Sequence, residues 1–190
     1  MKKKIVVTGG LGFLGSQLVD VLAKHGNIVK VIDIKKQSIK KKNYKNITFF
    51  KLNLSDNKKL YKIIRNAEII YHFAGYSDLT SSRFNPIKTI KLNIEYTIKL
   101  LKLCNDLNVK KFIFASSIYS TSSQGTFYAC SKRAAEDYIL EFCKNNKINY
   151  TILRFGTLFG KGSDLRNGVK KIIFNAVKNK EINYSGSKKA

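Results

Sequence analysis

The chain has 190 residues, 44% of them hydrophobic, which is enough for one main globular unit, and its apolar blocks are far shorter than the roughly 18 residues of a membrane span. The formal net charge is +24, but the lysines are spread along the whole chain, which disfavours a dedicated nucleic-acid site and leaves a general attraction for anionic nucleotides. Three scattered cysteines without a CxxC spacing indicate neither a disulfide framework nor a metal site, and MKKKIVV runs into TGG instead of a signal-peptide core, so a cytoplasmic protein is expected.

Short apolar runs alternate along the chain with stretches of helical period. Strands are predicted near residues 4–8, 28–34, 47–54, 68–74, 111–116 and 149–155. The apolar positions that share a helical face are Leu14, Leu18, Val21 and Leu22, then Ile87, Ile90, Ile94, Ile98 and Leu101, and later Ala135, Ile139 and Phe142. Continuous Val, Ile and Phe runs are typical of strands buried on both faces, so we expect an α/β fold with a doubly wound parallel sheet, a Rossmann fold.

A further helix is expected from about 167 to 178, followed by INYSG shortly before the chain stops. That ending is abrupt for a finished domain.

The first predicted strand runs into TGGLGFLGS, a glycine-rich turn that opens a helix. Gly10, Gly12 and Gly15 fit G-x-G-x-x-G, while Gly9, Gly12 and Gly15 fit G-x-x-G-x-x-G. Such glycines let the backbone approach a pyrophosphate closely, and the helix that follows directs its N-terminal amides at it. The turn therefore predicts a dinucleotide site.

Asp33 stands at the end of the second predicted strand, eighteen residues after Gly15. A carboxylate there can accept hydrogen bonds from both adenosine ribose hydroxyls and would repel a 2′-phosphate. NAD is therefore favoured over NADP, although Lys35 and Lys36 could hold a 2′-phosphate and keep NADP open.

Five motifs, TGGLGFLG, HFAG (72–75), SS (116–117), YACSK (128–132) and LRFGTLFG (153–160), occur in the order and on the strand ends found in the extended short-chain dehydrogenase/reductase superfamily. Within it, the chain resembles the NAD-dependent epimerase/dehydratase family, which acts on nucleotide sugars. The resemblance covers nearly the whole chain and implies an NAD-dependent nucleotide-sugar epimerase or dehydrogenase.

The resemblance also implies a set of cofactor-binding residues along one edge of the sheet. Carried over by position, they are Gly9, Gly12, Phe13, Leu14 and Gly15 at the pyrophosphate, Asp33 at the adenosine ribose, Asn53 and Leu54 at the adenine, Phe73, Ala74 and Gly75 beside the cofactor ribose, Asn93 on the following helix, and Phe155 beside the nicotinamide. The family usually has Asp where Asn53 stands, but an Asn oxygen can still accept from the adenine amino group.

Tyr128 and Lys132 are four residues apart and share one helical face, and they are the expected catalytic pair. A free phenol titrates near pH 10, so a base at neutral pH needs a pKa lower by about three units, which Lys132 and a positive nicotinamide ring could supply together. Lys132 would also hold the nicotinamide ribose. Ser117, at the end of the fifth strand, would bind the same substrate hydroxyl. Tyr119 lacks such a partner, because the residue four positions later is Ser123.

Three departures from the family pattern bear on the substrate and the reaction. Ile118 and Tyr119 stand where 4,6-dehydratases typically place Asp and Glu, which disfavours dehydration. The STSSQGTF segment replaces a longer substrate-facing loop, so it either contacts the substrate or leaves that side open. Thr157 stands where an asparagine often meets the substrate diphosphate, so the nucleotide sugar is not identified.

The resemblance implies a carboxyl-terminal domain that clasps the nucleotide sugar. Residues 1–165 are accordingly expected to form the NAD-binding domain and 166–190 the beginning of a truncated substrate-binding region. A homodimer through the helices that carry Asn93 and Tyr128 is also implied. Two alternatives of the same fold stay open, a non-catalytic dinucleotide sensor and an NADP-dependent reductase of a small carbonyl substrate, and a basic nucleic-acid binder is a third.

Overall fold

The computed structural model describes residues 2–36, 44–160, 162–163 and 167–182. The chain divides into two units, Met1–Phe155 and Gly156–Ala190, each described here by itself. In the second unit, helix α7 (Gly168–Asn179) confirms the helix predicted near 167–178. Most of INYSG lies outside the described residues, and the assignment of residues 1–165 and 166–190 to two domains stays a prediction.

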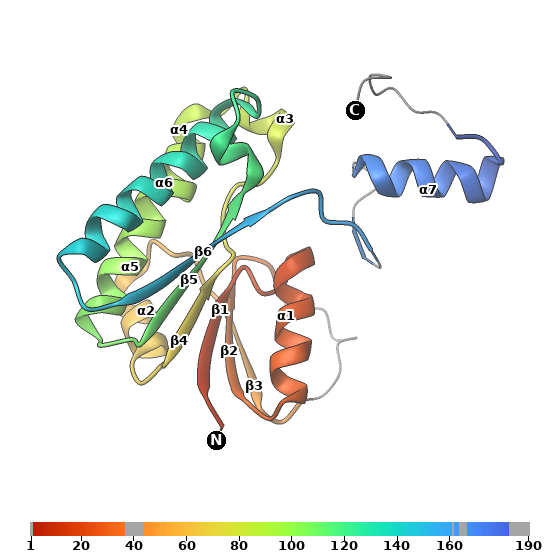
Figure 1. The fold of residues 1–190 in the computed structure, drawn as a ribbon. Coiled ribbons are helices and arrows are strands. Elements are labelled where there is room, and N and C mark those ends of the chain that lie inside the picture. Colours follow the sequence, from red (N-terminus) through yellow and green to blue (C-terminus); the bar gives the residue numbers. More distant parts are fainter. Residues whose placement is uncertain (1, 37–43, 161, 164–166, 183–190) are drawn as a thin grey trace. The chain divides into compact units, whose positions relative to one another are not determined.

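A six-stranded parallel sheet forms the centre of the first unit, in the order β3-β2-β1-β4-β5-β6 (Figure 1). The strands are β1 (Lys4–Thr8), β2 (Ile28–Asp33), β3 (Ile47–Lys51), β4 (Ile69–His72), β5 (Lys111–Ser117) and β6 (Asn149–Phe155). Each overlaps one of the six predicted strands, which confirms the Rossmann fold. The order reverses between β1 and β4, and in such sheets ligands bind beyond the carboxyl ends of the strands at that reversal.

Helices pack against both faces of this sheet (Figure 1). Helix α1 (Phe13–Lys24) buries Val19 and Ala23, and Val19 clusters with Val7, Val29 and Val31 of the strands. The main core lies on the opposite face. It is formed by α2 (Asn57–Ile64), α5 (Tyr96–Asp106) and α6 (Thr126–Lys144), which pack around β5.

Two short helices, α3 (Leu79–Ser82) and α4 (Pro86–Ile90), precede α5. A π-helical turn, Lys91–Glu95, joins α4 to α5, and a 3₁₀ turn, Ile118–Thr121, joins β5 to the loop before α6. The apolar stripe predicted from Ile87 to Leu101 does not all face the core, because Ile87 and Ile90 are 75% and 50% exposed while Leu101 is fully buried. The buried face of this region starts from Thr89 and Asn93 instead.

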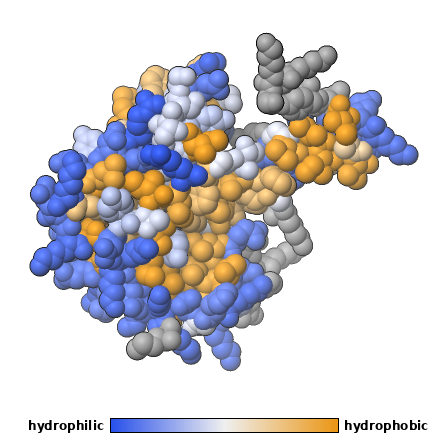
Figure 2. Space-filling model, viewed as in Figure 1, coloured by the Kyte–Doolittle hydropathy of each residue, from blue (hydrophilic) through white to orange (hydrophobic). Residues whose placement is uncertain are grey.

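Apolar residues also lie at the surface on the α1 side of the sheet. Strand alternation places Tyr71 of β4 and Leu153 of β6 on the face that carries Val7, and both side chains are only half-buried. Figure 2 shows apolar residues gathered over the strands beside α1 in this view. Among the described helices, none is long and apolar enough to cross a membrane.

Candidate active site

The glycine turn after β1 is packed so tightly that two of its positions require glycine. Gly9 has φ of +69°, and a Cβ added there would lie 2.6 Å from the backbone nitrogen of Ala74, beyond the end of β4. A Cβ at Gly15 would overlap the carbonyl oxygen of Gly9. Helix α1 then starts at Phe13, after Gly12, which has no side chain to cap it, so the amides of its first turn are available to an anion.

Asp33 fixes this turn from the neighbouring strand. Its carboxylate accepts hydrogen bonds from the backbone amides of Leu11 and Lys35, both at 2.9 Å. Each carboxylate oxygen keeps a lone pair for a further donor. Beyond β3, Asn53 is exposed and accepts from the amide of Ser55 at 3.0 Å, whereas the side chain of Leu54 is buried in the core. Leu54 could therefore support an adenine only through its main chain.

A buried chain of hydrogen bonds runs from β1 through β4 to α5. Thr8 Oγ1 lies 2.7 Å from Nδ1 of His72, and Nε2 of His72 lies 2.9 Å from Thr97 Oγ1. Thr97 donates to the carbonyl oxygen of Asn93, and Thr8 accepts from the amide of Ala74. His72 must therefore donate from Nε2 and accept at Nδ1, because Thr97 has only one hydrogen. Burial lowers the pKa of His72 to about 3, so the ring is neutral.

This series of hydrogen bonds through His72 was not predicted from the sequence. The available signal was a pair of polar residues, Thr8 and His72, inside otherwise apolar strands, since buried polar groups almost always have partners.

Asn93 joins the loop after β4 to helix α6. Its Oδ1 accepts from the amide of Tyr76 at 2.6 Å, and its Nδ2 donates to the carbonyl of Tyr76 at 3.0 Å and to Ser131 Oγ at 2.9 Å. Ser131 in turn donates to the carbonyl oxygen of Tyr128. Both amide hydrogens of Asn93 are thus used within the protein, so a cofactor contact predicted for this residue could only be made through Oδ1.

The predicted ribose and nicotinamide neighbours lie together at the ends of β4 and β6. The rings of Phe73 and Phe155 pack edge to face with their centroids 6.1 Å apart. A Cβ added at Gly75 would lie 2.9 Å from Asn93 Oδ1 and 3.8 Å from Lys132 Nζ. The structure therefore brings the HFAG segment and the predicted catalytic lysine to one place.

The three predicted catalytic residues meet where β5 ends beside α6. Lys132 is buried, and its Nζ donates to the carbonyl oxygen of Ala115 at 2.7 Å and lies 5.8 Å from the centroid of the Tyr128 ring. Burial lowers the pKa of Lys132 to about 8. Burial raises the pKa of Tyr128, a hydrogen bond with the Ser117 side chain opposes this shift, and the nearby Tyr119 adds to it. The pKa of Tyr128 is thus raised in this arrangement, and Lys132 is not among the groups that shift it.

Comparisons with known proteins identify the family of this chain. The model of the NAD dependent epimerase/dehydratase family matches residues 5–190. The chain belongs to this family. It is 31% identical over 176 residues to UDP-glucose 4-epimerase of Lactobacillus helveticus, an alignment that covers 85% of this chain and 53% of that one. It is 27% identical over 224 residues to dTDP-D-glucose 4,6-dehydratase of Dictyostelium discoideum, with 98% and 51% covered.

A solved structure is similar to this epimerase/dehydratase family member over most of its fold. UDP-N-acetylglucosamine 4-epimerase from Methanobrevibacter ruminantium, in complex with UDP-N-acetylmuramic acid, superposes with a TM-score of 0.83 at 31% identity, covering 95% of this chain and 64% of that one. The chain spans about half the length of the curated relatives it matches. The resemblance inferred from the motifs is confirmed.

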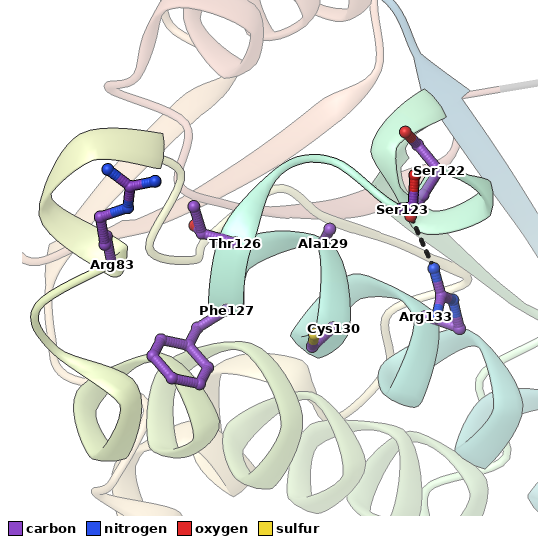
Figure 3. A pocket seen from close by; sticks show the side chains of 8 residues that line it. All are labelled: Arg83, Ser122, Ser123, Thr126, Phe127, Ala129, Cys130 and Arg133. Carbon is purple, nitrogen blue, oxygen red and sulfur yellow. Dashed lines mark hydrogen bonds between the residues drawn. The ribbon is translucent and has the colours of Figure 1, made fainter.

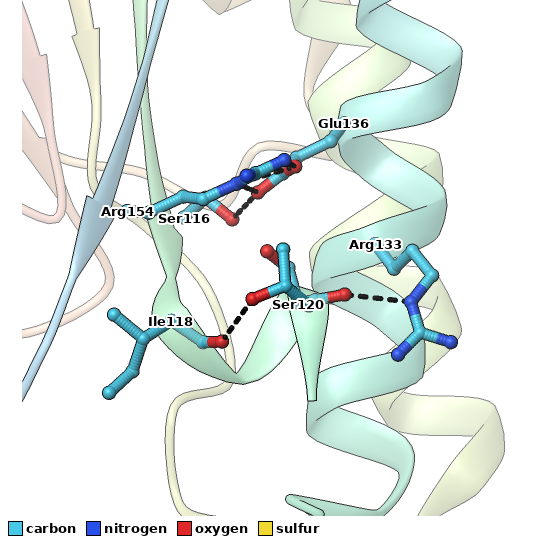
Figure 4. A network of polar contacts seen from close by, with 7 residues as sticks. Ser116, Ile118, Ser120, Arg133, Glu136 and Arg154 are labelled. Carbon is cyan, nitrogen blue, oxygen red and sulfur yellow. Dashed lines mark hydrogen bonds and ion pairs between the residues drawn. The ribbon is translucent and has the colours of Figure 1, made fainter. Parts of the chain in front are cut away.

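A second polar cluster lies next to the predicted catalytic residues and was not predicted from the sequence. Glu136 of α6 accepts from Ser116 Oγ and pairs with Arg154 of β6, whose Nη2 lies 2.6 Å from Oε2 (Figure 4). Below it, Arg133 donates to the carbonyl oxygen of Ser120 at 2.7 Å. Glu136 follows Lys132 by four residues, and Arg154 interrupts an apolar strand; these were the available signals.

A hollow of about 360 Å³ lies on the outer side of α6 (Figure 3). Phe127, Cys130 and Arg133 line it from the helix and Arg83 from the end of α3. Ser131 and Lys132 are buried on the inner side of the same helix, so the hollow lies on a different side of α6 from the predicted catalytic lysine.

Proposed function

We propose that the whole protein is an NAD-dependent nucleotide-sugar oxidoreductase whose net reaction is an epimerisation. The observation that carries this proposal is the gathering of Ser117, Tyr128 and Lys132 at the end of β5 in a member of the epimerase/dehydratase family. A binding module that only senses a dinucleotide has no need of a phenol beside a buried lysine.

The cofactor proposed for this site is NAD, and the residues present fit it. Gly9 and Gly15 let the turn pack directly on the neighbouring backbone, and the helix that follows begins without a side-chain cap, so its first amides are available to a pyrophosphate. Asp33 offers free lone pairs to the two hydroxyls of an adenosine ribose and would repel a 2′-phosphate. When bound, NAD supplies a hydride acceptor and a positive charge near Tyr128.

The protein's own part in the reaction is to hold the sugar and to move one proton. Ser117 and Tyr128 would both contact the secondary hydroxyl that is oxidised, and the Ser117 side chain lies near enough to influence the pKa of Tyr128. As the carbinol carbon loses a hydride, Tyr128 in its phenolate form takes the hydroxyl proton and becomes a phenol, and the C–O single bond becomes a carbonyl. Lys132, as an ammonium ion, stabilises the phenolate that takes this proton. In an epimerase both transfers then reverse on the other face of the sugar.

We further propose that the protein forms a homodimer and is located in the cytoplasm. The proposed partner is a second copy of the chain, bound through the helices that carry Asn93 and Tyr128, where Ile87, Ile90 and Phe127 expose large apolar side chains. We expect the enzyme in the cytoplasm, where nucleotide sugars are its substrates.

The test uses the full chain with NAD⁺ and a panel of UDP-, GDP- and dTDP-sugars. NADH absorbance reports a dehydrogenase, and chromatographic separation of sugar epimers reports an epimerase. The change Tyr128→Phe is expected to lower kcat by about 10²–10⁴-fold while NAD⁺ affinity in calorimetry stays near that of the wild type. Tyr119→Phe is the matched control and should retain most activity.

Different results would favour the alternatives. Tight NAD⁺ binding without turnover of any sugar would support a sensor, and preference for NADPH with a small carbonyl substrate would support a reductase. Unchanged turnover by Tyr128→Phe would defeat the catalytic assignment. A 4-keto-6-deoxy sugar as product would show a dehydratase.

A further inference from the structure

Glu136 is a buried carboxylate on the catalytic helix that takes no direct part in the proposed reaction. Glu136 is only 3% exposed to solvent. It accepts hydrogen bonds from Ser116 Oγ and from Arg154 Nε at 3.1 Å and Nη2 at 2.6 Å (Figure 4). Burial alone would raise the pKa of Glu136, but the hydrogen bonds from Arg154 and Ser116 hold it below 4.5, so the carboxylate is ionised. Burying a charged carboxylate costs free energy of desolvation, which its hydrogen bonds and its ion pair must offset.

The Glu136 carboxylate and the Lys132 ammonium group lie close to one another along α6 and bind neighbouring residues of β5. Glu136 lies one helical turn after Lys132 and on the same face of α6. The two side chains hold adjacent parts of one short segment, because Lys132 donates to the carbonyl oxygen of Ala115 and Glu136 accepts from Ser116. The next residue of that segment is Ser117. The end of β5 is thus attached to α6 by one positive and one negative group.

We propose that Glu136 is a positioning residue for the reaction proposed above: its carboxylate fixes the end of β5 against α6 and keeps Lys132 an ammonium ion beside Tyr128. This inference rests on the proposed function for its catalytic meaning, but the state of Lys132 can be measured without substrate or cofactor.

Among the charged and titratable groups around Lys132, Glu136 is the one whose charge favours a protonated Lys132. His72 of β4 is neutral, Tyr128 of the same helix is a neutral phenol, and Arg154 of β6 has a half-exposed side chain already paired with Glu136. Burial lowers the pKa of Lys132 to about 8, and the charge of Glu136 opposes that shift. Without Glu136, Lys132 would lose its proton closer to neutral pH, and a neutral amine cannot stabilise a phenolate by its charge.

Four variants of the full chain separate the electrostatic role from a structural one. Arg154→Met leaves the carboxylate buried without its ionic partner. The double variant Glu136→Met/Arg154→Met removes the whole pair, which commonly leaves stability almost unchanged. Glu136→Gln removes only the charge and keeps the size of the side chain. Glu141→Gln is the matched control, because Glu141 is on the same helix, ion-paired with Lys144, and exposed.

Two measurements are made on each variant. Competitive acetylation with acetic anhydride, followed by mass spectrometry of the Lys132 peptide, gives the pH at which Lys132 becomes reactive. Thermal unfolding gives Tm.

We expect the Lys132 midpoint near pH 8 in the wild type and in Glu141→Gln. It should lie lower by about one unit or more in Glu136→Gln and in the double variant. Arg154→Met should keep a midpoint at or above that of the wild type while its Tm falls by roughly 10 °C. In turnover assays, the loss of kcat with rising pH should begin about one unit lower in the double variant.

A wild-type Lys132 midpoint in the folded double variant would overturn the proposal and leave Glu136 a purely structural link. If the double variant does not fold, the same result with Glu136→Gln is decisive. Failure of the proposed function looks different: turnover is then absent from the wild type as well, while the acetylation midpoints still differ between variants.

Discussion

Replacing Gly9 with alanine tests whether the glycine turn is packed against the end of β4 as the structure shows. Gly9 and Gly26 both have positive φ, +69° and +76°, but an added Cβ at Gly26 meets nothing within 4 Å, whereas at Gly9 it would lie 2.6 Å from the Ala74 nitrogen. Gly26→Ala therefore carries only the cost of a left-handed backbone, about 1–2 kcal/mol. Gly9→Ala adds the cost of overpacking, about 1–3 kcal/mol.

The expected loss of unfolding free energy is thus about 1–2 kcal/mol for Gly26→Ala and about 2–5 kcal/mol for Gly9→Ala. For a chain of this size each kcal/mol lowers Tm by about 2–4 °C. Urea unfolding measures the free energies, and calorimetry with NAD⁺ measures binding, which only Gly9→Ala should weaken. Equal destabilisation by the two changes, with equal NAD⁺ affinity, would refute the close packing of Gly9 on Ala74.

Three further outcomes follow from burial and exposure. His72 has a pKa of about 3 in the folded protein and 6.5 as its ordinary value, so the unfolded chain takes up its proton first as the pH falls. Stability should then drop by up to about 1.4 kcal/mol per pH unit between roughly pH 6 and 3, and His72→Gln should flatten this slope in urea unfolding at several pH values. Burial lowers the pKa of Lys132 from 10.5 to about 8, so between these pH values the unfolded chain holds this proton more strongly than the folded protein does. The unfolding free energy should therefore rise with pH by up to about 1.4 kcal/mol per unit between roughly pH 8 and 10.5, and Lys132→Met should remove this rise while turnover is lost; an unchanged slope in the variant would contradict this. Finally, Ile87→Asp with Ile90→Asp should convert a dimer to a monomer in light scattering after size exclusion, and an unchanged mass would place the interface elsewhere.

The strands could be predicted from the sequence because each contains a short block of mostly apolar residues, and the glycine turn because its spacing is tied to a strand before and a helix after it. The helical faces were harder. Ile87 and Ile90 have the spacing of a core stripe, but the structure exposes them, and the π-helical turn at Lys91–Glu95 shifts the buried face to Asn93. A periodicity argument assumes a regular helix and cannot detect such a shift.

Neighbouring residues of the candidate site could be predicted where they belong to one short sequence motif. Contacts between residues far apart in the sequence could not be predicted. Tyr128 and Lys132 share one helix turn, so their proximity follows from the sequence. The partnership of Glu136 with Arg154 depends on how α6 packs on β6, and that of His72 with Thr97 on how α5 packs on β4. Neither packing is encoded in local spacing, although a charged residue in an apolar strand indicated that a partner was needed.

The hydrogen-bonded chain through His72 limits how a proton can leave the active site. Every bond in it has a fixed direction: the Ala74 amide donates to Thr8, Thr8 to His72, His72 to Thr97, and Thr97 to the Asn93 carbonyl. To carry a proton along it, a backbone amide would have to lose one and a peptide carbonyl would have to gain one, which neither does near neutral pH. These hydrogen bonds are therefore closed to proton conduction, and in the proposed reaction a proton on Tyr128 would have to reach solvent along a route that does not pass through His72.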